Sequence, residues 1–198
     1  MKHKIMRAAD YRRRPWKNGL GTTLEVYREP VEGDSFDWRV SIADLVENSF
    51  FSAFPSLIRV ICTLEGRGMR LNIDGVQTRS LLKYDPLVFS GDSKVESELL
   101  DGPIRDFNLI FDPDKCSARL QWLDPSSPQV FCSPSSSVLL FALGPTALEF
   151  GEHTLELDFF DAALLTNEFR SLTRIQISSR GEPTARCCLI EVDRLPKS

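Results

Sequence analysis

Two short polar clusters beside glycine turns hold the residue types most able to do chemistry in this chain. The first is Pro15-Trp16-Lys17-Asn18-Gly19-Leu20-Gly21, and the second is Gly102-Pro103-Ile104-Arg105-Asp106-Phe107-Asn108. Lysine, arginine and amide side chains donate hydrogen bonds to anions, whereas transition metals need imidazole, thiolate or grouped carboxylates. Neither cluster contains histidine or cysteine. This composition favours a small-anion site over a metal site.

Alternation with a period of two places further polar side chains on shared faces. In residues 36–42 every even position is apolar and every odd position is polar, so Arg39 and Ser41 lie on one face of a predicted half-buried strand. In the second cluster the same rule puts Asp106 and Asn108 together. The guanidinium of Arg39 is a planar fork that matches a carboxylate. The alternatives are a surface arginine paired with a nearby aspartate, and an Asp106 that only holds an arginine or the first cluster in place.

Strand-like segments recur along the whole chain, and no window longer than about ten residues carries a helical stripe. The predicted strands are residues 36–42, 57–64, 69–73, 87–89, 106–111, 138–143, 154–160 and 187–192. Glycine turns such as Glu65–Gly68 and Asp74-Gly75 separate several of them. Short strands at this spacing predict an all-β jelly-roll barrel or sandwich.

The organisation of the chain suggests two β halves. Similar turns at Gly75 and Gly151 hint at internal repetition. We predict an N-terminal half over residues 1–123, a connection rich in serine and proline over residues 124–137, and a C-terminal half over residues 138–198. The second half is expected to pack on the first as one compact unit.

Composition places the chain among ordinary globular proteins. Hydrophobic residues make up 42% and charged residues 26% of the 198 residues. No apolar run approaches a membrane span, and no signal peptide follows the basic start, so a cytoplasmic location is expected. The five cysteines form no C-x-x-C pair, which predicts reduced, mostly buried thiols. Because Cys187 and Cys188 are adjacent in a predicted strand, one is expected to face inward and the other outward.

The net charge of −4 hides a basic start. Residues 1–30 hold eight lysines and arginines against three acidic residues, so they carry +5 and the remainder carries −9. The run Arg12–Arg14 has no interleaved aromatic residues, which makes it a weak signal for nucleic acid. We expect a solvated face, or pairing within the fold, and no nucleic-acid partner.

Two hairpin regions resemble the motifs of cupin barrels. They are the turn Glu65–Gly68 and the segment Pro86–Gly91. In metal-binding cupins the first motif supplies His-x-His and a glutamate, and the second adds another histidine. The two histidines here, His3 and His153, lie outside both stretches. A metal site of that type cannot be assembled, so no metal and no other cofactor is expected.

Six stretches between residues 15 and 108 resemble the HutD/Ves family of small cupin proteins. They are Pro15-Trp16-Lys17-Asn18-Gly19-x-Gly21-x-Thr23-x-Glu25, Phe36-Asp37-Trp38-Arg39-Val40-Ser41-Ile42-Ala43, Phe51-Ser52-x-Phe54-Pro55 with Arg59, Leu64-Glu65-Gly66-x-Gly68, Phe89-x-Gly91-Asp92, and Gly102-Pro103-x-Arg105-Asp106-Phe107-Asn108. They cover roughly half of the chain. Leu20 and Ser56 stand where glycine is usual in the family. The resemblance implies a cupin jelly-roll barrel, with two related halves in a bicupin arrangement.

The residues and the resemblance together define a candidate site. The predicted ligand-binding residues are Trp16, Lys17, Asn18, Arg39, Ser41, Arg59, Arg105, Asp106 and Asn108. Glu25 is predicted to support a basic residue. Structural roles remain open for two of them, since Asn18 before glycine is a turn signature and Trp16 suits a pocket wall. No catalytic residue is assigned, because no Ser-His-Asp or Cys-His arrangement is visible.

The resemblance also implies a class of function. Some members are encoded with histidine-utilisation enzymes and are thought to govern that pathway by sensing an intermediate, and others carry a stress-induced name. We therefore expect a metal-independent protein with a regulatory or accessory role that binds a small carboxylate, such as urocanate or a formylated or formimino glutamate. The alternative is a metal-free isomerase or epimerase acting on a small acid or sugar, with Glu25 and Asp106 as acid–base groups. A role without catalysis is favoured, no membrane partner is expected, and a homodimer is left open.

Overall fold

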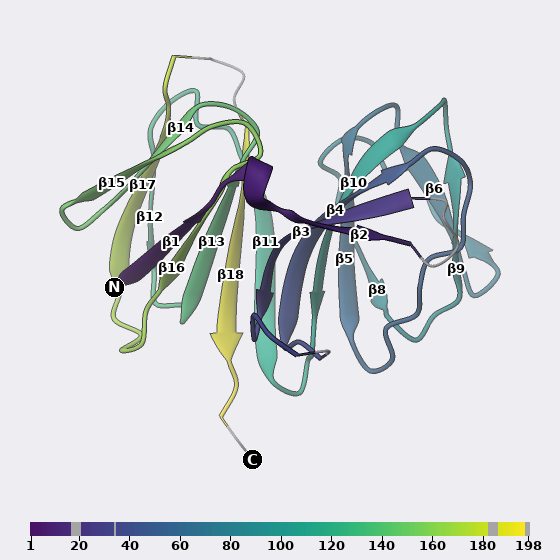
Figure 1. Cartoon of the computed structure of the whole chain (residues 1–198), viewed down its shortest axis with the longest axis horizontal. Helices are drawn as coiled ribbons and strands as arrows, with labels where there is room; N and C mark the ends of the chain where they lie inside the picture. The colour runs from purple at the N-terminus through teal and green to yellow at the C-terminus, as the bar shows by residue number, and fades with distance from the viewer. Residues whose placement is uncertain (17–20, 34, 182–185, 197–198) are drawn as a thin grey trace. The chain divides into compact units, whose positions relative to one another are not determined.

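The computed structural model of the chain is almost entirely β-strand. It describes residues 1–16, 21–33, 35–181 and 186–196. Its contacts divide the chain into two units (Figure 1): Met1–Tyr11 with Cys116–Ser198, here called the terminal unit, and Arg12–Lys115, here called the central unit. Within the described residues the only helix is the short 3-10 helix η1 (Ala8–Asp10), and no helix is long and apolar enough to cross a membrane.

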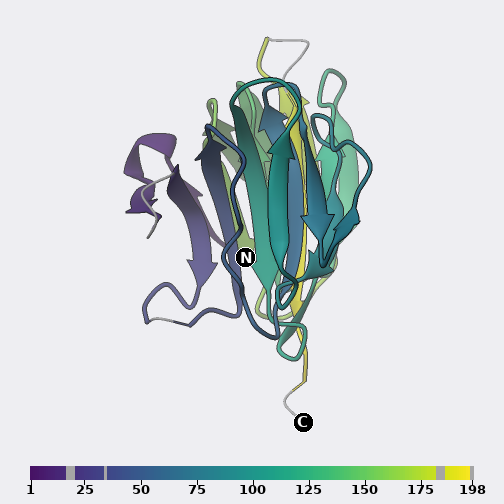
Figure 2. The same ribbon diagram turned by 90° about the vertical axis from the view of Figure 1, so that its right-hand side faces the viewer.

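The central unit contains two antiparallel sheets. Its strands are β2 (Arg12–Pro15), β3 (Gly21–Glu29), β4 (Trp38–Leu45), β5 (Ile58–Glu65), β6 (Met69–Ile73), β7 (Val76–Gln77), β8 (Leu87–Ser90), β9 (Val95–Leu99) and β10 (Ile104–Phe111). One sheet has the order β2-β3-β4-β10-β5-β8 and the other the order β7-β6-β9. Figure 2 faces this unit and shows its long strands running antiparallel.

The interior of the central unit lies between these sheets. An apolar cluster joins Leu45 and Ile61 of the larger sheet to Leu71 and Val95 of the smaller one. Alternation along β4 puts Arg39 on the same face as Leu45, so this polar side chain points toward the interior. The opposite face of β4 is also buried, with Trp38, Val40 and Ile42 at most 3% exposed. The predicted alternation is therefore present, but the strand is buried on both faces rather than half-buried.

The terminal unit is likewise built from two antiparallel sheets. Its strands are β1 (Lys2–Met6), β11 (Cys116–Leu123), β12 (Gln129–Ser133), β13 (Ser137–Ala142), β14 (Thr146–Phe150), β15 (His153–Leu157), β16 (Ala162–Thr166), β17 (Thr173–Ser179) and β18 (Cys187–Arg194). The sheet orders are β1-β16-β13-β18-β11 and β12-β17-β14-β15. Two units with two sheets each are compatible with a pair of related halves.

The boundaries of the units differ from those expected at residues 123 and 138. Strand β1 pairs with β16, and β11 pairs with β18, so both ends of the expected first half belong to the terminal unit. The expected connection contains β12, which pairs with β17. Flanking serines and prolines hid this strand in the sequence. Long-range pairing between strands, which composition does not encode, decides where each segment belongs.

Most predicted strands are present, and two local expectations need correction. The predicted strand over residues 154–160 ends at Leu157, because the chain turns there into β16. Cys187 packs in the core cluster of the terminal unit and Cys188 points to the opposite face of β18, as expected, but that outer face is buried as well. Four of the five cysteines are buried and Cys132 is exposed, in agreement with the prediction of mostly buried thiols.

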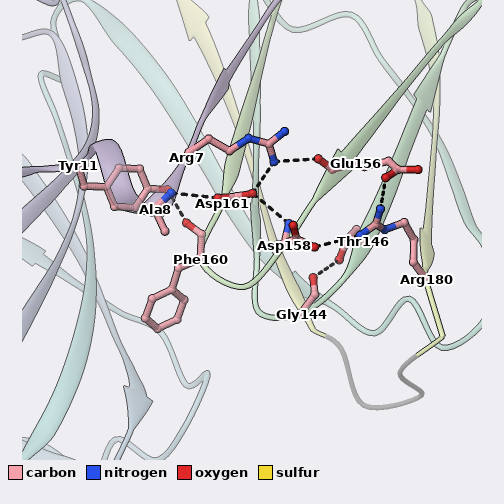
Figure 3. A network of polar contacts seen from close by, with 10 residues as sticks. All are labelled: Arg7, Ala8, Tyr11, Gly144, Thr146, Glu156, Asp158, Phe160, Asp161 and Arg180. Atoms are coloured by element: carbon pink, nitrogen blue, oxygen red, sulfur yellow. Dashed lines mark hydrogen bonds and ion pairs between the residues drawn. The ribbon is translucent and has the colours of Figure 1, made fainter.

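One buried carboxylate fixes the segment that follows β1 (Figure 3). Asp161, whose side chain is 7% exposed, accepts hydrogen bonds from the Arg7 guanidinium at 2.6 Å and from the backbone amides of Ala8 at 2.9 Å and Asp158 at 3.1 Å. The Tyr11 hydroxyl donates to the carbonyl of the residue before Asp161 at 2.5 Å. Residues 7–11 are thereby held to the turn between β15 and β16.

A second turn, in the central unit, depends on Gly91. The Gly91 amide donates to the Leu57 carbonyl at 2.7 Å, and the Phe54 amide donates to the Gly91 carbonyl at 2.8 Å. A Cβ at Gly91 would lie 2.1 Å from the Phe54 carbonyl oxygen, so only glycine permits this approach. Within the same turn Ser56 has a φ of 63° and donates its amide to the Asp92 carboxylate at 3.2 Å. The left-handed φ explains why glycine suits position 56.

We predict that Asp161→Asn lowers the free energy of unfolding by about 1–3 kcal/mol at pH 7, because it removes charge-assisted hydrogen bonds from a buried acceptor. Burial raises the pKa of Asp161, but the bonds from Ala8, Asp158 and Arg7 outweigh it and leave the pKa below its usual value. A depressed pKa stabilises the fold above the unfolded-state pKa, and this stabilisation is lost as the pH falls through the folded-state pKa. Urea unfolding at pH 7 and pH 3 should show the difference from wild type shrinking in acid.

Asp158→Asn is the matched control for that variant. The Asp158 carboxylate is 70% exposed and accepts only from the Arg180 guanidinium, at 2.9 Å, among the contacts of the described residues. An exposed ion pair contributes about 0–1 kcal/mol, so this variant should unfold near wild type. Equal losses in the two variants would contradict the role assigned to Asp161.

We predict opposite effects on stability for substitutions at Gly91 and at Ser56. Gly91→Ala should lower the free energy of unfolding by about 2 kcal/mol or more, because the new methyl group overlaps a backbone carbonyl. Ser56→Gly should cost nothing and add up to about 1 kcal/mol, because a left-handed φ strains any residue with a Cβ. Denaturant unfolding of both variants measures this. A stable Gly91→Ala protein would show that the turn is not held by this close approach.

Candidate functional site

A cavity of ≈ 590 Å³ in the central unit gathers most of the predicted site residues. Trp16, Arg39, Ser41, Arg59, Asp106 and Asn108 all line it. The last five come from β4, β5 and β10, which are neighbours in the order β4-β10-β5. Ion-binding and hydrogen-bonding groups therefore converge from three adjacent strands of one sheet.

The register of these strands brings the two arginines together. Ile110 on β10 is paired with Arg39 on β4 and with Arg59 on β5. The two arginine backbones therefore flank one residue and lie about 10 Å apart, twice the spacing between strands. Both guanidinium carbons lie near the ring of Phe54, at 5.0 Å for Arg39 and 5.5 Å for Arg59. One aromatic ring thus serves two cations.

Arg59 is buried inside an aromatic cage. Its guanidinium carbon lies 4.9 Å from the ring centroid of Phe51 and 5.1 Å from that of Phe89, in addition to Phe54. Only 6% of the residue is exposed. Burial lowers the pKa of Arg59 to about 10, opposed by Asp106 and reinforced by Arg39. The side chain remains a cation at neutral pH, and its ring contacts offset part of the cost of desolvation.

Arg39 is a second buried arginine that contacts the Phe54 ring. Its guanidinium carbon lies 4.9 Å from the centroid of Phe36. Burial lowers its pKa, and the nearby Glu25 opposes the shift. Among the described residues, the Nε–H groups of both Arg39 and Arg59 are buried without a hydrogen-bond partner. Buried donors of this kind are rare unless something else accepts from them.

Asn108 connects Arg59 to a buried acid. Arg59 Nη2 donates to Asn108 Oδ1 at 2.8 Å, and Asn108 Nδ2 donates to Asp106 Oδ1 at 2.7 Å. Asp106 is 2% exposed. Burial raises the pKa of this carboxyl to about 7, against a lowering by Arg59. The amide stands between the cation and the acid, so the two are linked without being a direct pair.

The first cluster supplies a wall of the cavity. The Trp16 indole N–H donates to Thr23 Oγ1 at 2.8 Å, so this donor is already used within the fold. A Cβ at Gly21 would lie 2.9 Å from the Trp16 ring, which shows that glycine lets the ring lie on β3. Trp16 therefore has the wall role left open by the sequence. Lys17 and Asn18 lie outside the described residues.

Two predicted residues do not line the cavity. Arg105 lies on the other face of β10, where its guanidinium contacts Asp44 at 2.6 Å and Glu65 at 3.6 Å. The hydrogen bond that Arg105 donates to Asp44 raises the pKa of Arg105, and burial opposes this rise. Glu25 is buried beside Arg14, with 3.5 Å between carboxylate and guanidinium, so it lies near basic groups, as expected of a supporting residue.

Sequence reasoning missed the aromatic half of this site. Phe51, Phe54 and Phe89 were recognised only as parts of motifs, although arginine and phenylalanine recur together in those motifs. For Arg14 the expected alternatives are a solvated face or pairing within the fold, and Arg14 pairs with Glu25 and also lines the cavity. Its position opposite Thr23 on the neighbouring strand explains this placement.

The two histidines lie elsewhere. The rings of His3 and His153 are 5.1 Å apart in the terminal unit, outside the residues that line the cavity. Within the described part of the chain, no group of three or more histidine, cysteine or acidic side chains is arranged to hold a metal ion. The donors at the cavity are guanidinium and amide groups, which suit an anion.

Solved structures share this fold. A Bacillus subtilis oxalate decarboxylase variant superposes with a TM-score of 0.69 at 9% identity, covering 98% of this chain and 78% of its own. At that identity the likeness shows the cupin fold alone. A conserved protein of unknown function from Pseudomonas aeruginosa PAO1 superposes with a TM-score of 0.92 at 39% identity, covering 98% of this chain and 100% of its own.

Two further relatives and a family profile identify the family of this chain. HutD from Pseudomonas fluorescens SBW25, solved in a formate condition, superposes with a TM-score of 0.85 at 40% identity, over 98% of this chain and 100% of its own. An uncharacterized 21.2 kDa protein in the hutC 3′ region of Pseudomonas putida is 51% identical over 140 residues, 70% of this chain and 73% of its own. The HutD family profile matches residues 8–184. The chain therefore belongs to the HutD family.

Proposed function

We propose that the central cavity binds a small carboxylate metabolite without a metal ion, and that the protein acts as a regulatory or accessory component linked to histidine utilisation. The observation that carries this proposal is the pair of buried guanidinium groups, Arg39 and Arg59, whose Nε–H donors lack partners among the described residues. Membership of the HutD family suggests the link to histidine utilisation.

Electrostatics favour an anionic ligand. Arg39 and Arg59 repel each other across Phe54, since Arg39 lowers the pKa of Arg59. A carboxylate between them would relieve this repulsion. It would also accept hydrogen bonds from the two Nε–H groups, which lack partners among the described residues. In a poorly hydrated site such interactions are screened less than at the surface. Arginine suits this task better than lysine because its planar fork fits both oxygens of a carboxylate.

The size of the cavity favours more than a carboxylate alone. Its volume of ≈ 590 Å³ falls within the range of small-molecule pockets, about 300–1,000 Å³. Trp16, Phe50 and Phe51 add aromatic surface to the lining. A carboxylate with a planar or apolar body therefore fits, which is the chemistry of urocanate; formylated and formimino glutamate share only the carboxylate groups and have polar, flexible bodies. Formate, the smallest carboxylate, is a useful minimal probe.

We predict that a histidine-pathway acid raises the thermal midpoint of the protein in a dose-dependent way, with or without EDTA, because a ligand that binds only the folded state stabilises it. Arg39→Ala should weaken the affinity measured by calorimetry about tenfold to a hundredfold, the loss typical of a charged hydrogen bond. Arg105→Ala is the matched control, since it removes the same group from the face of β10 outside the cavity. Equal losses in both variants, or none in Arg39→Ala, would refute the site.

Asp106 supports a second candidate function, a metal-free isomerase or epimerase. This carboxyl lines the cavity, and burial raises its pKa to about 7, which suits proton transfer at neutral pH. Its predicted partner Glu25 does not line the cavity, so one acid would have to both remove and return the proton.

The isomerase or epimerase hypothesis predicts a chemical change in the bound acid. An acid that binds, when incubated with the protein in deuterated water, should exchange a carbon-bound proton or change into an isomer, as seen by NMR. Asp106→Asn should abolish this turnover while binding persists. If every acid that binds stays unchanged over prolonged incubation, the binding function stands alone.

A further inference from the structure

The cavity proposed to bind an anion also contains a buried acid. Asp106 lines it at 2% exposure, on the same face of β10 as Asn108. An ionised Asp106 would confront a bound carboxylate with a like charge, and two carboxylates in one buried site cannot both ionise without a large penalty. A shared proton removes the penalty and turns a repulsive contact into a hydrogen bond.

The groups around Asp106 leave it without a direct counter-ion. On β5, Arg59 reaches it only through Asn108. On β4, the backbone N–H of Ala43 donates a hydrogen bond to Asp106, which lowers its pKa, and Asp44 pairs with Arg105 on the other face of β10. An ion pair with Arg59 would have held the carboxyl ionised and neutralised the cation. The amide spacer leaves the cation available to a ligand and the acid available to a proton.

More distant charges lie beyond this group. Arg39 on β4 also lines the cavity, and Glu25 on β3 lies near both Arg39 and Arg14 of β2. The charged groups that act on Asp106 are Arg59, which favours its ionised form, and Asp44, which opposes it. The response of Asp106 to a ligand therefore depends chiefly on what happens to the charge of Arg59.

We propose that the cavity binds its carboxylate ligand together with one proton from solvent, held at Asp106 so that this side chain donates a hydrogen bond to the ligand. The proposal rests on the proposed function of the same cavity. The step is a protonation: an ionised ligand, an ionised Asp106 and one proton from solvent become a neutral Asp106 hydrogen-bonded to the ligand carboxylate, with one O–H bond formed at Asp106 and every bond of the ligand unchanged. The affinity for the ligand thereby depends on pH as well as on the charge of the ligand.

The pKa of Asp106 in the free protein decides how the affinity changes with pH. Burial raises the pKa of Asp106 to about 7 while Arg59 lowers it. A bound anion screens Arg59 and adds its own negative charge, so the pKa of Asp106 rises further in the complex. Binding then takes up a proton wherever the pH lies between the two values. Above pH 7 the dissociation constant should rise about tenfold per pH unit until the bound-state pKa is reached.

The test uses sodium formate as the probe, because formate is ionised throughout the range examined. Its dissociation constant is measured on the full chain by thermal shift at pH 6, 7, 8 and 9, with sodium chloride holding the ionic strength constant. We expect little change between pH 6 and 7 and a loss of about tenfold per unit above it. The acid panel consists of urocanate, formylated glutamate and formimino glutamate. Calorimetry with the strongest-binding acid of this panel, in two buffers of different ionisation enthalpy, counts the protons taken up.

Two variants assign the proton to one residue. Asp106→Asn has the shape of the neutral acid, so it should bind formate with an affinity independent of pH and tighter than wild type at pH 9. Asp44→Asn, which removes the neighbouring acid on the other face of the sheet, should keep the wild-type slope. A wild-type slope of zero overturns the proposal, and so does a slope that survives in Asp106→Asn.

Failure of the proposed function has a different signature. If neither formate nor any acid of the panel shifts the midpoint at any pH, the cavity does not bind carboxylates and both proposals fall. If acids bind with equal affinity from pH 6 to 9, the cavity binds carboxylates and only the proton at Asp106 is refuted. Should Asp106→Asn fail to fold, the wild-type slope and the proton count still decide the matter.

Discussion

The burial of the Arg59 guanidinium is the constraint on which the site depends. Moving a charge out of water is costly unless neighbouring groups replace its hydration. Here the replacement comes from three phenylalanine rings, one amide and the Ser52 carbonyl, which accepts from Nη1 at 3.2 Å. Among the described residues no carboxylate forms an ion pair with Arg59, and Asp106 reaches it only through Asn108. The turn at Gly91 fixes the backbone of Phe54, whose ring contacts both guanidinium groups.

This arrangement inverts the electrostatics of a metal site. A metal centre brings the positive charge as a ligand and surrounds it with anionic or neutral donors. In this cavity the protein itself supplies the fixed cations, Arg39 and Arg59, on strands rather than on flexible loops. On the proposed function, the ligand then carries the negative charge. The same barrel interior can thus serve opposite chemistries, depending on which side chains the central strands direct inward.

Local pattern predicted the faces of the site, and long-range pairing decided its composition. Alternation correctly put Arg39 with Ser41 and Asp106 with Asn108, because side-chain direction along a strand is a local property. The same rule puts Arg105 opposite Asp106, so the pattern itself argued against including it. The meeting of Arg39 and Arg59 across Ile110 could not be predicted, because register between strands separated by many residues is set by the whole sheet. The membership of β1 in the terminal unit was hidden for the same reason.

The choice of an amide at position 108 has consequences for the rest of the cavity. An asparagine accepts from Arg59 with its oxygen and donates to Asp106 with its nitrogen, so it satisfies both neighbours while keeping them apart. An aspartate there would neutralise Arg59 and place two acids side by side, and an apolar residue would leave both groups unsatisfied. Asparagine is the side chain that leaves one cation and one titratable acid facing the same space. This combination of groups is what the proposed coupling between ligand binding and protonation of Asp106 requires.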